Sequence, residues 1–270
     1  MTKPLKLLTS AILCALVSTA TADAAITPVR QTGRAIDLAR ALSAQSGLVT
    51  SAAFSAAPPF SRPAAVSTTR LAGFPAPSAR TSGGRYAILS TGDATLASRP
   101  NTSTFTGREA GGPEIRGAYD VTILRLDLDI PTGATCLKFD VRLLSDEYRE
   151  AVGTEYGDAF IAELSASTWQ VFGPPTPSID APLNIARDTP DGFLTITKTG
   201  LSAMTAAAAK GTTYDGATRR IRVAGAVTPG STILYLSLFD RGDRVYDTTA
   251  FIDNLRTVQA GTCATRAVAA

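Results

Sequence analysis

Strict alternation of apolar and polar residues constrains the fold of this chain more than any other feature. Apolar residues stand at every second position of 124–130, with charged residues between them. The side chains of a β-strand point alternately to its two faces, so this spacing predicts a strand with one buried and one charged face. The alternation returns in 136–143 after the turn residues 131–133, which predicts an antiparallel hairpin.

Short strand-like runs separated by turn residues occupy most of the remaining chain. They are found at 48–54, 85–90, 158–164, 169–172, 193–197, 219–223 and 233–239. The spacing of alanine and leucine predicts an N-terminal helix over 32–47, and an Ala-rich run predicts a short second helix over 202–210. The predicted fold class is therefore all-β, a β-sandwich or jelly-roll-like arrangement with these two helices.

Composition predicts the domain organisation. Residues 1–24 have a basic start, a short apolar run and small residues near the end, which is typical of a secretory signal peptide. One domain is expected over 25–257, followed by a tail at 258–270. Proline, alanine and serine in 52–80 predict an irregular surface segment, and 173–182 is expected to be a loop. No other segment is apolar enough to enter a membrane, so we expect a secreted or periplasmic protein.

Two cysteines remain after the leader, Cys136 and Cys263. Export places them in an oxidising compartment, which favours a disulfide between them, with two free thiols as the alternative.

Charge and histidine content exclude several classes of function. A formal net charge of +3 is too small to predict a nucleic-acid partner or an anionic membrane surface. Arginine dominates 30–108 and acids dominate 109–163, which predicts two differently charged faces of one domain. Histidine is absent, which excludes catalysis by a Ser-His-Asp triad, a Cys-His pair or a histidine-bound zinc.

Two clusters of acids are the candidate site. The first contains Asp146, Glu147 and Asp158, and the second contains Asp240, Asp243, Asp247 and Asp253. Concentrated carboxylates repel one another unless they are exposed or bind a cation, and calcium prefers six to eight oxygens. Pooled at one end of a sandwich, the two clusters supply enough oxygens for one Ca²⁺. A solvated acidic loop for the first cluster, and Asx-turns and salt bridges for the second, are the alternatives.

The motifs Ser145-Asp146-Glu147-Tyr148 and Asp240-x-x-Asp243-x-x-Tyr246-Asp247, in this order, resemble those of the choice-of-anchor L domain, a bacterial exported family. The resemblance covers roughly residues 30–257. It departs from the family at Asp146, where glutamate is usual, and at Gly157, where asparagine is usual. It implies an exported β-rich surface or matrix-type protein and no particular reaction, and the chain shows no anchoring motif after Leu255.

The hypothesis is an exported, non-catalytic β-sandwich that binds calcium, or is stabilised by its acidic loops, and acts in cell-surface adhesion or matrix interaction. Its partners are then an extracellular protein or a glycan. The alternative is a carbohydrate-active protein, either a lectin-like binder or a glycosidase that uses a carboxylate pair such as Glu147 and Asp158.

Overall fold

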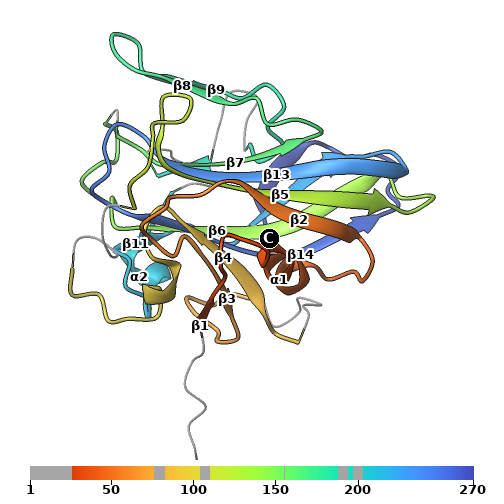
Figure 1. Cartoon of the computed structure of the whole chain (residues 1–270), viewed down its shortest axis with the longest axis horizontal. Coiled ribbons are helices and arrows are strands. Elements are labelled where there is room, and N and C mark those ends of the chain that lie inside the picture. Colours follow the sequence, from red (N-terminus) through yellow and green to blue (C-terminus); the bar gives the residue numbers. More distant parts are fainter. Residues whose placement is uncertain (1–25, 76–82, 104–109, 155, 188–193, 197–202) are drawn as a thin grey trace, which may run out of the picture.

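The computed structural model describes residues 26–75, 83–103, 110–154, 156–187, 194–196 and 203–270. This part of the chain forms two antiparallel sheets that lie face to face (Figure 1). The prediction of an all-β sandwich is confirmed. The predicted signal peptide, 1–24, lies outside the described residues.

The larger sheet runs in the order β1-β3-β4-β14-β6-β12-β15, with β11 beside β6. Its strands are β1 (Ile26–Pro28), β3 (Ala64–Ser67), β4 (Tyr86–Ser90), β14 (Thr248–Val258), β6 (Cys136–Ser145), β12 (Ile221–Ala226), β15 (Arg266–Ala269) and β11 (Gly216–Ala217). The smaller sheet contains, in order, β10 (Leu194–Thr195), β7 (Ala159–Leu164), β13 (Gly230–Asp240), β5 (Tyr119–Ile130) and β2 (Val49–Ala56).

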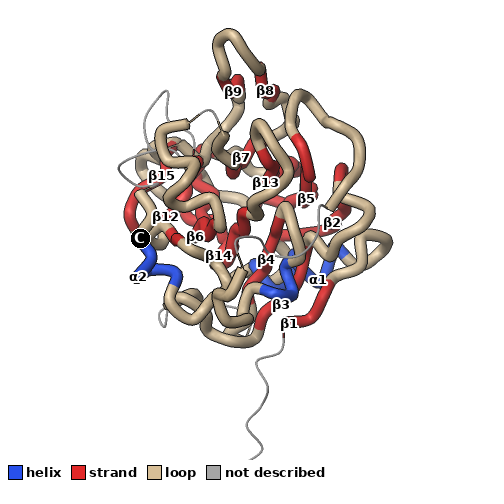
Figure 2. Tube along the Cα trace, turned by 90° about the vertical axis from the view of Figure 1, so that its left-hand side faces the viewer, coloured by secondary structure: helices blue, strands red, loops and turns tan. Residues whose placement is uncertain are grey.

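The remaining elements lie around the two sheets. A hairpin of β8 (Gln170–Phe172) and β9 (Ser178–Asp180) projects beyond the smaller sheet (Figure 2). Helix α1 (Ala35–Leu42) packs beside β2, β3, β4 and β14, and α2 (Ala206–Ala209) lies beside β11. A 3-10 turn, η1 (Ala94–Leu96), follows β4.

The main core fills the space between the sheets. The alternate apolar residues of β5 are buried there, and the rings of Phe139 on β6 and Phe160 on β7 meet across the layers with centroids 6.4 Å apart. The outer face of the smaller sheet is also covered, because Trp169 stacks on Phe239 at 4.2 Å. Burial of each large side chain contributes about 1.5–3 kcal/mol, so these contacts hold the strand ends in place.

The predicted hairpin of 121–130 and 136–143 is wrong. Both segments are strands, but β5 pairs with β13 and β2, whereas β6 pairs with β14 and β12. Alternation shows that a strand has one buried face, and it does not show which strand lies next to it. The turn at 131–133 sends the chain across the core, so the apolar faces of β5 and β6 oppose each other.

Four boundaries also need correction. The segment predicted to be irregular, 52–80, contains the end of β2 and all of β3, and the predicted loop 173–182 contains β9. The predicted tail, 258–270, supplies β15, which pairs antiparallel with β12 and forms the edge of the larger sheet. Helix α1 is shorter than 32–47, since the chain becomes extended at Ser43 to enter β2.

The predicted disulfide is present. Cys136 at the start of β6 bonds to Cys263, which lies 127 residues further along the chain. Such a bond suits an oxidising compartment. In the part of the chain that the structure describes, no helix is long and apolar enough to span a membrane.

Candidate functional site

Acidic side chains from both sheets converge at one end of the sandwich. In the larger sheet, β6 ends and β14 begins here, with Ser145 opposite Thr248. In the smaller sheet, β13 ends where β5 begins, with Asp240 opposite Tyr119. The loops that join these strands therefore bring the two acidic motifs together, although about a hundred residues separate them in the sequence.

Five of the seven predicted ligands form one buried group, which we call the carboxylate cluster. Its members and their exposed fractions are Asp146 (1%), Glu147 (1%), Asp158 (0%), Asp240 (1%) and Asp247 (5%). Burying an ionised carboxylate is costly unless a partner of opposite charge or several hydrogen-bond donors accompany it. The partners of these side chains therefore decide what the cluster does.

Backbone donors satisfy only part of the cluster. The Asp158 amide donates to Glu147 Oε2 at 3.2 Å, and the Arg241 amide donates to Asp158 Oδ1 at 3.3 Å. Both carboxyl oxygens of Asp240, and Oδ2 of Asp158, are buried with no hydrogen-bond partner among the described residues. Within the same residues, no lysine or arginine forms an ion pair with Glu147, Asp158 or Asp240.

The electrostatics follow from this geometry. Burial, followed by the negative charge of Asp158, raises the pKa of Glu147 far above its usual range. Burial raises the pKa of Asp158, and this effect outweighs the hydrogen bonding to Thr248 and Asp240, which acts to lower that pKa. Burial and the charges of Asp158 and Asp247 raise the pKa of Asp240. These carboxyls must therefore share protons or neutralise their charge with a cation.

A layer of buried hydroxyl groups supports the carboxylate cluster. Thr248 Oγ1 bonds to Ser145 Oγ at 2.8 Å, and the Thr248 amide donates to Thr91 Oγ1 at 3.0 Å. Thr249 Oγ1 bonds to Ser90 Oγ at 2.9 Å on the same side. These bonds tie the end of β4 to the start of β14 and the end of β6, so the base of the cluster is rigid.

Gly92 is required where the chain passes Asp247. A Cβ atom at position 92 would overlap the carboxyl group of Asp247. The turn after β4 therefore lies directly against the cluster.

Two predicted ligands lie elsewhere. Asp243 is partly exposed, and its Oδ1 accepts a hydrogen bond from the Val245 amide in an Asx-type turn. Asp253 lies opposite Asp140 in the middle of the larger sheet, beside a β-bulge. Asp243 nevertheless lies near enough to the cluster for its charge to raise the pKa of Glu147 and of Asp158, whereas Asp253 lies apart from it.

Asp120 was missed by the sequence analysis. It is buried next to the cluster at the start of β5, where its charge raises the pKa of Asp240. Arg244 Nη1 lies 3.6 Å from Asp120 Oδ1, which gives this carboxylate an ion pair. A single acid before a strand has no distinguishing spacing, so the sequence provides no signal for it.

The cluster fits a hard cation in its chemistry. All its donors are oxygens, which Ca²⁺ prefers, and its unpartnered oxygens lie on Asp158 and Asp240. As the described side chains stand, no three of them are grouped closely enough to hold a metal ion. A bound cation would therefore have to draw repelling carboxylates together.

An aromatic groove of about 430 Å³ lies beside the cluster. Its lining includes Tyr119, Tyr156, Phe172, Glu114 and Arg241. The exposed fractions of Tyr156 and Phe172 are 41% and 46%, so both rings reach solvent. The Gly157 amide bonds to the Arg241 carbonyl at 3.3 Å, which joins one wall of this aromatic groove to the cluster.

Comparisons with known proteins add little to this picture. No family model and no curated protein matches the chain. One similar solved structure is that of TmCBM61 in complex with β-1,4-galactotriose. It is 10% identical, with a TM-score of 0.31, and the match covers 80% of this chain and 92% of that one. A likeness of this size does not bear on what the present chain binds.

Proposed function

We propose that the protein is an exported, non-catalytic β-sandwich that acts in extracellular recognition, at a cell surface or in a matrix, and that Ca²⁺ stabilises its acidic end. The observation that supports this proposal is the burial of Asp158 and Asp240 with carboxyl oxygens that have no hydrogen-bond partner. Membership of the choice-of-anchor L family, suggested by the sequence motifs, agrees with this role and remains a prediction.

Calcium is the cation that best suits these donors. The chain has no histidine, and Cys136 and Cys263 are joined in a disulfide, so the described residues offer none of the imidazole or thiolate ligands that zinc prefers. Ca²⁺ tolerates irregular oxygen geometry, whereas Mg²⁺ requires a nearly ideal octahedron. A site assembled from loops of two sheets therefore favours Ca²⁺.

Isothermal titration of CaCl₂ into EDTA-dialysed protein tests the proposal. We expect one site per chain, no comparable heat from MgCl₂, and loss of binding in Asp158→Asn. Asp129→Asn is the matched control, because Asp129 is exposed on β5 and outside the cluster. If the wild type binds no calcium, the cluster is stabilised by shared protons and the calcium part of the proposal is wrong.

Glycan binding is the second candidate, and the aromatic groove favours it. Exposed aromatic rings stack on sugar rings, and Glu114 and Arg241 supply polar groups for hydroxyls. The paired-carboxylate glycosidase is less favoured, because Glu147 and Asp158 are almost wholly buried and no substrate reaches both in this conformation.

A glycan array with the wild type, Tyr156→Ala and Phe172→Ala, each in calcium and in EDTA, tests this candidate. We expect the wild type to bind glycans, both variants to lose the signal, and EDTA to weaken it through the wall that joins the aromatic groove to the cluster. A wild type that binds no glycan, or variants that retain its binding, would remove the aromatic groove as a sugar site.

A further inference from the structure

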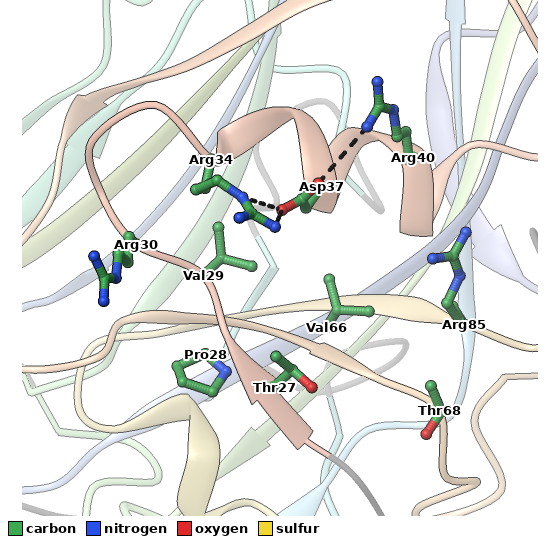
Figure 3. Close-up of a pocket in the computed structure, with 10 residues that line it drawn as sticks. All are labelled: Thr27, Pro28, Val29, Arg30, Arg34, Asp37, Arg40, Val66, Thr68 and Arg85. Carbon is green, nitrogen blue, oxygen red and sulfur yellow. Dashed lines mark hydrogen bonds and ion pairs between the residues drawn. The ribbon is translucent and has the colours of Figure 1, made fainter.

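A pocket rich in arginine lies beside α1, away from the carboxylate cluster. It has a volume of about 470 Å³, within the range of roughly 300–1,000 Å³ that is typical of small-molecule sites. Elements β1, α1, β3 and the residue before β4 contribute its lining (Figure 3). Its charged residues are Arg30, Arg34, Arg40, Arg85 and Asp37.

Four guanidinium groups and one carboxylate give the lining of this arginine pocket a formal charge of +3. Asp37 is paired with Arg34 at 2.6 Å and more weakly with Arg40 at 3.8 Å. Arg30 has no ion pair or hydrogen bond among the described residues, and in Figure 3 it lies on the opposite side of the pocket from Arg85. The single acid therefore cannot neutralise the pocket.

The base of the arginine pocket has a different character. Val29, Val66 and Pro28 supply apolar surface, and Thr27 and Thr68 place hydroxyl groups beside it (Figure 3). A small inorganic anion uses only the guanidinium groups. A ligand with a partly apolar ring, hydroxyl groups and a negative charge uses the whole lining.

The site is also extended. A second cavity of about 530 Å³ lies along α1 and shares two lining residues, Arg40 and Arg85, with the first. It includes the polar side chains of Gln45 and Thr50. A ligand of several units is therefore accommodated, with the shared arginines contacting it between the two cavities.

We propose that the arginine pocket binds an acidic oligosaccharide, with sugar rings on Pro28 and Val66 and carboxylate or sulfate groups on the arginines. The planar guanidinium group donates two parallel hydrogen bonds to either anion, which makes arginine well suited to this recognition. The proposal is independent of calcium, because no member of the carboxylate cluster lines the pocket.

Fluorescence polarisation with labelled probes tests the proposal. The probes are a uronic acid trisaccharide, a sulfated tetrasaccharide and a neutral trisaccharide, each measured in EDTA. We expect one of the acidic probes to bind, the neutral probe to bind at least tenfold more weakly, and affinity to fall as salt rises. The acidic probe that binds identifies the anion as uronate or sulfate.

Variants separate the pocket from general surface charge. Arg30→Gln combined with Arg85→Gln should weaken binding at least tenfold, because it removes two of the four guanidinium groups that line the pocket. The control, Arg266→Gln, removes one positive charge from β15 at the opposite edge of the same sheet and should change affinity less than twofold.

Asp37→Asn provides a test that poor folding cannot mimic. It removes the competing carboxylate and releases Arg34 and Arg40, so we expect affinity to rise about threefold or more. Failure of both acidic probes to bind, or equal losses in Arg266→Gln and the double variant, would overturn the proposal. Weaker binding by Asp37→Asn would do the same.

Discussion

Asp240→Asn should have opposite effects on stability in the presence and absence of calcium. Without a cation, the buried Asp240 carboxylate repels Asp158 and Asp247, and among the described residues no lysine or arginine forms an ion pair with it. Two like charges about 4 Å apart repel by up to about 4 kcal/mol at an effective dielectric constant of about 20. Proton sharing relieves part of this, so we expect the variant to be about 1–2 kcal/mol more stable than the wild type in EDTA.

With calcium, the order reverses. A ligand present at about 100 times its dissociation constant stabilises the native state by about 2.7 kcal/mol. For a domain of this size, 1 kcal/mol shifts the melting temperature by roughly 2–4 °C. We therefore expect 1 mM CaCl₂ to raise the melting temperature of the wild type by about 5–10 °C and that of Asp240→Asn by less than about 1 °C, so the two melting temperatures cross.

The assay is thermal unfolding at pH 8, monitored by the fluorescence of Trp169, which stacks on Phe239 beside Asp240 in the sequence. Asp129→Asn is the control, because Asp129 is exposed on β5 and lies outside the cluster. It should keep the calcium response. An Asp240→Asn protein that melts below the wild type in EDTA would refute the reasoning, because the carboxylate would then stabilise the fold without a cation.

Three further predictions concern the fold. Burial raises the pKa of Asp253 to about 7, so the native state holds a proton that the unfolded state releases near pH 4. The free energy of unfolding of the wild type therefore falls as pH rises from about 4 to 7. In urea titrations, Asp253→Asn should raise the free energy of unfolding by up to about 4 kcal/mol at pH 8 but by little at pH 4. An increase independent of pH would contradict this. Cys136→Ser with Cys263→Ser should lose about 4–5 kcal/mol, and dithiothreitol should cause the same loss in the wild type. Trp169→Phe removes the bond from Nε1 to Ser237 Oγ at 3.0 Å and should cost about 1–3 kcal/mol by chemical denaturation, whereas an unchanged midpoint would show that water replaces the bond.

The sequence predicted where strands occur better than it predicted which strands pair with one another. Alternation in 124–130 correctly identified the buried face of β5, because side-chain direction is a local property. Pairing depends on contacts between distant segments, such as Asp240 opposite Tyr119, and no local pattern contains them. The same limit explains why β3 and β15 were missed: both are four residues long and lie next to proline-rich or alanine-rich sequence.

The candidate site was predicted in part for a similar reason. Asp146 and Glu147 stand next to a recognisable strand end, so their position at a strand terminus follows from the sequence. In the sequence, Asp253 was grouped with the aspartates of 240–247 as a candidate ligand. In the structure it lies inside β14, away from the loop and in the middle of the larger sheet. Asp120 joined the site only through the pairing of β5 with β13.

The disulfide gives the two edges of the larger sheet different resistance to mechanical load. Strand β1 is held to β3 by three paired residues, and β15 is held to β12 by four. Tension applied at residues 26 and 270 would peel β1 away first. On the other edge, peeling β15 transfers the load at Cys263 to Cys136, which lies on β6 in the interior of the sheet. A protein tethered through its C-terminal strand would therefore bear force on a covalent bond to its core, whereas one tethered through β1 would bear it on a few backbone hydrogen bonds.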